Sequence, residues 1–297
     1  MEQESWGRRI WRLIYPGLTY FGICFIVEVI ATVLIAMTAI AGIDPASAGV
    51  EERLFNEMWN RALSMALELQ ILSAAITLPI LILYYKRDRK RDRAAGRDRR
   101  YTAVPAWQFI FIVILGFAAC LAGNNLITAS GLYTVSDTYA EISEILYGGK
   151  LVLEFVGLGI LVPIVEEFIF RGLIYRRLRE YLNIGPAAVI CSVIFSLYHG
   201  NLVQGVYAFL LSLLFIYCYE RYHTMAAPIL FHAAANILSV AVSELGVLNV
   251  MYTSLGAFWT GTILSCLILI VMVYLIERFV HSEEIGGKQT ADEETTA

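Results

Sequence analysis

The stretch Leu161–Leu178, LVPIVEEFIFRGLIYRRL, sets two adjacent glutamates in an otherwise apolar run. Each charge near the centre of a membrane helix costs about 2.5–3.5 kcal/mol, so the pair requires a partner or a function. In a helix Glu167 lies over Arg171, four positions on, which favours an ion pair and leaves Glu166 as the unpaired carboxylate. Pro163 is expected to bend the helix beside the pair. Both glutamates could instead be structural, tied to Arg171 or to neighbouring helices.

The composition indicates a membrane protein. Of 297 residues 58% are hydrophobic and only 16% are charged, against about 25% charged in soluble domains. Net charge is −4, yet nine of the 22 Lys and Arg residues fall between Lys86 and Arg100. No aromatic residue interleaves this basic run, which argues against nucleic-acid binding. The run is more typical of a segment that anchors the chain at the cytoplasmic side of the membrane. Attraction of anionic lipid or of a substrate is the alternative.

Apolar runs long enough to cross a bilayer predict an all-α, polytopic membrane bundle of about eight transmembrane helices. The first run, 16–42, exceeds the apolar region of a signal peptide and is interpreted as an uncleaved span. Basic loops alternate with the acidic loops 42–60 and 132–150, which predicts that both termini are cytoplasmic. The eight ranges are 16–42, 64–85, 106–131, 151–175, 184–200, 203–220, 225–243 and 255–277.

The five cysteines all fall inside apolar segments and form no CxxC pair. This spacing argues against a disulfide framework or a zinc knuckle. They are Cys24, Cys120, Cys191, Cys218 and Cys266.

Two further polar motifs lie in the later spans. FSLYHG places Phe195 and His199 on one helical face, and APILFHAAANI does the same for His232 and Asn236. A histidine and an asparagine can both donate hydrogen bonds, as an oxyanion site requires. Each pair taken alone is also typical of a polar contact between helices.

Three motifs in order resemble the CPBP family of intramembrane proteases, which includes type II CAAX prenyl endopeptidases and bacterial Abi or bacteriocin-processing members. EEFIFR fits EExxxR, FSLYH fits FxxxH and HAAAN fits HxxxN. The resemblance implies a CAAX-protease-like core at 151–242. A three-helix membrane region with the cytoplasmic basic loop would precede it at 1–150. The last helix and a disordered polar tail would follow at 243–297.

The resemblance also implies roles for single residues. Glu166 matches the glutamate that activates a water, with His199 as its partner. His232 and Asn236 match the pair that stabilises the oxyanion, and Glu167 and Arg171 are expected to support the site. The expected substrate is a peptide or a membrane protein, cleaved in the bilayer of a bacterial plasma membrane.

Peptide hydrolysis needs a water, a base and donors for the oxyanion. Ser196 and Cys191 stand at unfavourable offsets from His199 for nucleophilic catalysis, which favours direct attack by water. Glu166, His199 and His232 could alternatively bind a catalytic zinc, although HExxH is missing. We expect a metal-free glutamate mechanism without a cofactor.

Two other function classes stay open. Polar residues within the first three spans are typical of a transporter or proton-coupled carrier. A noncatalytic scaffold of the same fold is the third class. The residues that favour a transporter are Glu28, Glu68, Asn124 and Asn125.

Overall fold

The computed structural model describes residues 5–41, 49–97, 100–132, 150–246 and 249–285. They form helices and connections, apart from an isolated pairing of Tyr101 with Glu284. In chain order the elements are α1 (Trp6–Ala41), α2 (Val50–Ser64), α3 (Ala66–Ala94), η1 (Ala106–Gln108), α4 (Phe109–Ser130), α6 (Leu151–Val156), η3 (Gly157–Leu161), α7 (Val162–Glu167), η4 (Phe168–Tyr175), α8 (Arg176–Leu178), α9 (Ile184–Tyr198), α10 (Leu202–Tyr222), α11 (Ala226–Leu245), η5 (Asn249–Tyr252) and α12 (Leu255–Phe279).

Each of the eight predicted spans coincides with a helix or a helical run, and the prediction of an all-α polytopic membrane bundle is confirmed. Among the described residues, six helices are long and apolar enough to cross a bilayer: α1, α3, η1 with α4, α10, α11 and α12. The other two predicted spans are special cases. The run α6–α8 changes between α- and π-helix, and α9 has only 15 residues.

Helix α2 was not predicted, because a search for long apolar runs passes over amphipathic helices. Leu54, Met58 and Ala62 recur at intervals of four and share its less exposed face. Phe55 and Trp59 stack on its exposed face, with ring centroids 6.3 Å apart.

Most of the predicted acidic loop 132–150 and the polar tail after residue 285 lie outside the described residues. The predicted division of the chain into an N-terminal region, a protease core and a C-terminal region, with boundaries at residues 150 and 242, stays a prediction.

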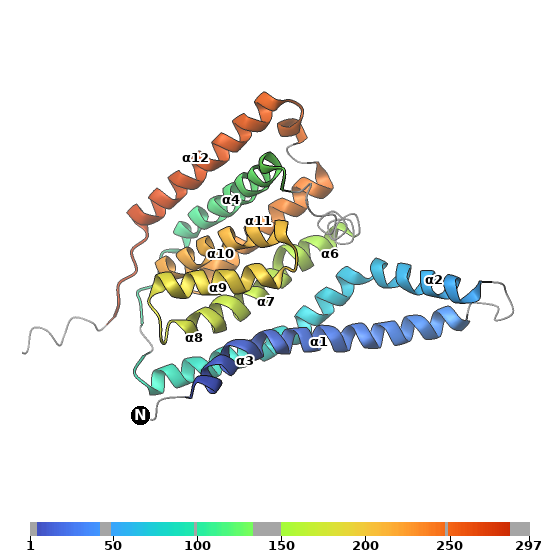
Figure 1. The fold of residues 1–297 in the computed structure, drawn as a ribbon. Coiled ribbons are helices and arrows are strands. Elements are labelled where there is room, and N and C mark those ends of the chain that lie inside the picture. The colour runs from blue at the N-terminus through green and yellow to red at the C-terminus, as the bar shows by residue number, and fades with distance from the viewer. Residues whose placement is uncertain (1–4, 42–48, 98–99, 133–149, 247–248, 286–297) are drawn as a thin grey trace, which may run out of the picture.

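The basic residues gather at one side of the bundle. Figure 1 shows the start of α1, the ends of α3 and α12 and the connection from α8 to α9 on that side. Ion pairs join these segments there, with Arg12 2.6 Å from Glu180 and Arg177 2.6 Å from Asp88. We call this side the basic end, and it carries Arg8, Arg9, Arg12, Lys86–Arg97 and Arg176–Arg179.

Close helix packing places α11 at the centre of the bundle, between α4 and the glutamate-bearing helix α7. Gly116 of α4 lies against α11 so closely that a Cβ atom there would stand 2.7 Å from the carbonyl oxygen of Phe231. Phe231 is completely buried. Any larger residue at position 116 would therefore push α4 away from the helix that carries His232.

Candidate active site

The two glutamates end α7, a short α-helical segment between the π-helical segments η3 and η4. A π-helical turn holds one residue more than an α-helical turn and is frequent at functional sites. Pro163 is the second residue after η3, so the distortion expected beside the pair takes the form of a change in helix type.

Glu167 is completely buried and holds two partners through one oxygen. Its Oε1 accepts hydrogen bonds from Nη1 of Arg171 at 3.0 Å and from Nδ1 of His232 at 2.9 Å. Arg171 also donates from Nη2 to Oγ of Ser212 at 2.6 Å, and its guanidinium lies 4.8 Å from the centre of the Phe215 ring. Helix α10 thus supports the ion pair that the spacing of four residues predicted.

Glu166 faces a different environment. Together with His199, His232 and Asn236 it lines a cavity of about 370 Å³. Its Oε2 lies 3.6 Å from Nε2 of His232, so the ring contacts both glutamates, one through each nitrogen. Of the two adjacent carboxylates, one is held by Arg171 and the other borders the cavity.

His199 caps the carboxyl end of α9, where its Nδ1 lies 2.8 Å from the carbonyl oxygen of Phe195. A carbonyl only accepts, so Nδ1 carries a proton and Nε2 of the neutral ring has a free lone pair. The following turn is fixed by Asn201, whose side chain caps α10 through the backbone nitrogen of Gln204 at 2.8 Å. This cap sets where His199 stands relative to α10.

His232 is held in the same tautomer, because the carboxylate of Glu167 accepts the proton on Nδ1. Its ring stacks on Phe215 with centroids 4.6 Å apart and planes 22° apart. One turn on, Asn236 donates from Nδ2 to the carbonyl oxygen of Leu158 in η3 at 2.9 Å. An amide has two N–H donors, so the second stays available to a ligand in the cavity.

Four predicted catalytic residues thus meet at one cavity, from α7, the end of α9 and α11, while Glu167 and Arg171 lie behind it. Their catalytic roles stay predictions. Ser196 donates to the carbonyl oxygen of Gly205 at 2.7 Å, and the Cys191 thiol lies 3.4 Å from that of Phe170. These contacts engage both side chains that were considered as nucleophiles.

The structure adds cavity residues that the motifs did not predict. Tyr198 immediately precedes His199 in FSLYHG, and Gln204 lies in the first turn of α10. Their closeness to a motif residue in the sequence could have predicted both. Nothing in the sequence near Gln70 or Tyr207 indicates that they line the cavity. The further polar lining residues are Asn124 and Ser239.

The predicted zinc ligands do not form a ligand set in the arrangement seen. Within the described ranges, no three His, Cys, Asp or Glu side chains are grouped so as to hold a metal ion. Both nitrogens of His232 already face a glutamate, and Nδ1 of His199 bonds to a backbone carbonyl. Because Nδ1 of each ring is already hydrogen-bonded, a zinc ion would have to be bound through Nε2 of both histidines.

The residues that favoured a transporter lie in separate environments. Glu28 is exposed on α1, and Glu68 pairs with exposed Lys150 at 2.9 Å. Asn125 is buried and bonds to Thr262 at 3.0 Å, which joins α4 to α12. Among these residues, Asn124 alone borders the cavity of Glu166.

Residues 148–238 match the family model described as type II CAAX prenyl endopeptidase Rce1-like. Over this segment the chain is similar to the CPBP family, in agreement with the three motifs. All three motifs, with Glu166, His199, His232 and Asn236, fall inside the matched residues.

One curated relative of this chain is the candidate membrane peptidase YdiL of Bacillus subtilis (strain 168). It is 25% identical over 170 residues, which cover 57% of this chain and 69% of the relative. No solved structure matches the chain. The family and the relative together support a membrane protease in general terms.

Proposed function

We propose that the protein is an intramembrane endopeptidase in which Glu166 activates a water. The observation that carries this proposal is the convergence of Glu166, His199, His232 and Asn236 on one cavity, from elements far apart in the chain. Because Glu167 is engaged by Arg171 and His232, Glu166 is the carboxylate available to a cavity water.

In the proposed reaction, the oxygen of the water attacks the peptide carbonyl carbon while Glu166 takes the proton. The carbonyl oxygen becomes an oxyanion, and the C–N bond then breaks as Glu166 passes the proton it took from the water to the departing amine. His199 can accept a hydrogen bond from the water through Nε2, because its Nδ1–H points to Phe195.

Asn236 and His232 are the proposed oxyanion donors. Asn236 offers the amide hydrogen that Leu158 leaves unused. His232 donates from Nε2 only as an imidazolium, since Glu167 holds the proton on Nδ1. Because Oε1 of Glu167 holds Nδ1 of this ring, the buried Glu167–Arg171 pair would act on the reaction through the position of His232.

The proposed substrate is a peptide or membrane-protein segment that approaches from the end of the bundle opposite the basic end. Cavity residues from four helices stand toward that end: Gln70 early in α3, Asn124 late in α4, Gln204 at the start of α10 and Ser239 late in α11. If the basic end is cytoplasmic, the cleaved bond enters from the outer half of the membrane.

The experiment is cleavage of membrane-tethered reporters by purified protein in detergent, with product ends read by mass spectrometry. Wild type is compared with Glu166→Gln and with Glu28→Gln, a matched change at an exposed glutamate outside the cavity. The proposal expects cleavage by wild type and Glu28→Gln alone. Full activity of Glu166→Gln would overturn the assignment of the base. If the protein does not cleave the reporters and its activity depends instead on Glu28 or Glu68, a carrier would be favoured.

A further inference from the structure

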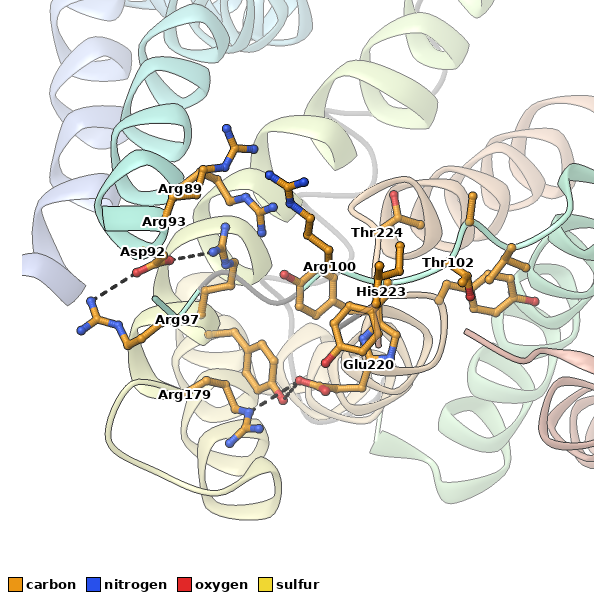
Figure 2. A pocket seen from close by; sticks show the side chains of 18 of the residues that line it. Arg89, Asp92, Arg93, Arg97, Arg100, Thr102, Arg179, Glu220, His223 and Thr224 are labelled. Atoms are coloured by element: carbon orange, nitrogen blue, oxygen red, sulfur yellow. Dashed lines mark hydrogen bonds and ion pairs between the residues drawn. The ribbon is translucent and has the colours of Figure 1, made fainter. Parts of the chain in front are cut away.

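A second and larger cavity lies at the basic end, well separated in its lining residues from the cavity of Glu166. It encloses about 990 Å³. Figure 2 shows arginine side chains reaching it from α3, from the segment after α3 and from the turn that follows α8. The six arginines that line it are Arg89, Arg93, Arg97, Arg100, Arg176 and Arg179.

The described lining residues carry more positive than negative charge. Three carboxylates, Asp92, Glu180 and Glu220, face the six guanidinium groups, which leaves an excess of three positive charges. Each carboxylate is already engaged by cations. Asp92 lies 2.8 Å from Arg176 and 3.4 Å from Arg97, and Glu220 lies 3.6 Å from Arg179.

Glu180 contributes even less to neutralising the cavity. It lies 2.6 Å from Arg12 and 2.5 Å from Arg91, two arginines that are not among the lining residues. Its charge is therefore shared with cations outside the cavity. The net field inside favours an anion.

The hydroxyl groups of Tyr101, Thr102 and Thr224 complete the lining. Figure 2 shows Thr102 and Thr224 on the side opposite α3. Tyr101 stacks on His223 with ring centroids 3.5 Å apart, which fixes its position. Guanidinium groups bind phosphate oxygens with two parallel hydrogen bonds, and hydroxyls add single ones. A segment that only fixes membrane orientation needs enough positive charges but no particular arrangement of them. Here, arginines from three segments converge on one cavity.

The ends of the apolar helices α3 and α10 border this cavity, as do the apolar residues Val104, Phe109 and Ile285. A group bound there stands at the depth of lipid head groups, with apolar side chains beside it. We infer that the cavity binds the phosphate of an anionic phospholipid from the leaflet at the basic end. Soluble phosphate compounds share this chemistry but have no need of the interfacial position.

The test uses the full-length protein in zwitterionic detergent, with phosphatidylglycerol, phosphatidylcholine and inorganic phosphate as separate probes. Binding is read by native mass spectrometry and by the shift in thermal unfolding. Phosphatidylglycerol should bind more tightly than phosphatidylcholine. Arg100→Gln and Arg93→Gln should each weaken it about fivefold, since one basic residue at a lipid surface is worth about 1 kcal/mol.

Arg87→Gln is the matched control, because Arg87 is exposed on the same helix as Arg93 and does not line the cavity. This variant should bind phosphatidylglycerol as wild type does. Equal binding of the two lipids, or an equal loss in Arg87→Gln and Arg100→Gln, would overturn the inference. Tighter binding of inorganic phosphate than of phosphatidylglycerol would overturn the lipid assignment.

Discussion

Oε1 of Glu167 lies 2.9 Å from Nδ1 of His232, so the second glutamate of the pair orients the ring that faces the first. The same oxygen receives Arg171 at 3.0 Å. One buried carboxylate thus connects the ion pair of the EExxxR motif to the histidine of HxxxN, 65 residues later.

Glu166→Gln should lower the cleavage rate by about 10²–10⁴-fold, the usual contribution of a general base. The amide keeps the size of the side chain but cannot accept the proton of the water. Single-turnover cleavage of the reporter measures the effect. A thermal unfolding midpoint like that of wild type would separate lost chemistry from lost folding.

Glu167→Gln should reduce stability by about 3–5 kcal/mol, because it leaves the guanidinium of completely buried Arg171 without its counter-charge. The control is Glu57→Gln, which breaks an exposed ion pair with Arg61 at the same spacing of four residues. That change should cost about 0.3–0.5 kcal/mol. Thermal or denaturant unfolding in detergent measures both, and equal losses would contradict the proposed importance of the buried pair.

His223→Asn should make stability less sensitive to acid. Burial lowers the pKa of His223 from its usual value, partly offset by the nearby carboxylates of Glu220 and Glu284. The unfolded chain then binds the proton more readily than the folded chain. The stabilising contribution is complete above the unfolded pKa of about 6.5 and is lost as pH falls toward the folded value. Asparagine tolerates the φ of 50° found at this position.

The readout is the unfolding midpoint of wild type and His223→Asn between pH 8 and pH 5. Wild type should lose more stability on acidification than the variant does. Parallel curves would show that other groups determine the acid sensitivity.

Single cysteines should report the orientation of the bundle. Leu202→Cys lies on an exposed position at the start of α10, and Ala95→Cys lies on an exposed position at the basic end. In intact cells a membrane-impermeant maleimide should label the first, and the second only after permeabilisation. The reverse pattern would place the basic end outside.

A zinc chelator should leave cleavage unchanged if the glutamate mechanism holds. The reporter assay is repeated after prolonged chelation, with added zinc as the reverse arm. Loss on chelation and recovery with zinc would instead favour a metal-dependent site built from Glu166, His199 and His232.

The positions of the long apolar helices were predictable from hydropathy, and the Glu167–Arg171 pair from a spacing of four residues along one helix. The meeting of the three motifs was implied by the family resemblance, not by local sequence. The contact between Glu167 and His232 could not be predicted locally, since it joins residues far apart in the chain. The π-helical segments η3 and η4 depend on a one-residue shift in backbone hydrogen bonding that no side-chain pattern encodes. The sequence showed only the charge of the basic run that contributes four of the arginines of the second cavity. It did not show that these arginines line a cavity.

The shortness of α9 has a consequence for how water reaches the catalytic residues. Its 15 residues span about 22 Å, whereas the hydrocarbon core of a bilayer is about 30 Å thick. A membrane relieves such hydrophobic mismatch by becoming locally thinner around the short helix. Because His199 caps the end of α9, this deformation would bring the aqueous phase down to the histidine. Hydrolysis would then need no long channel through the protein.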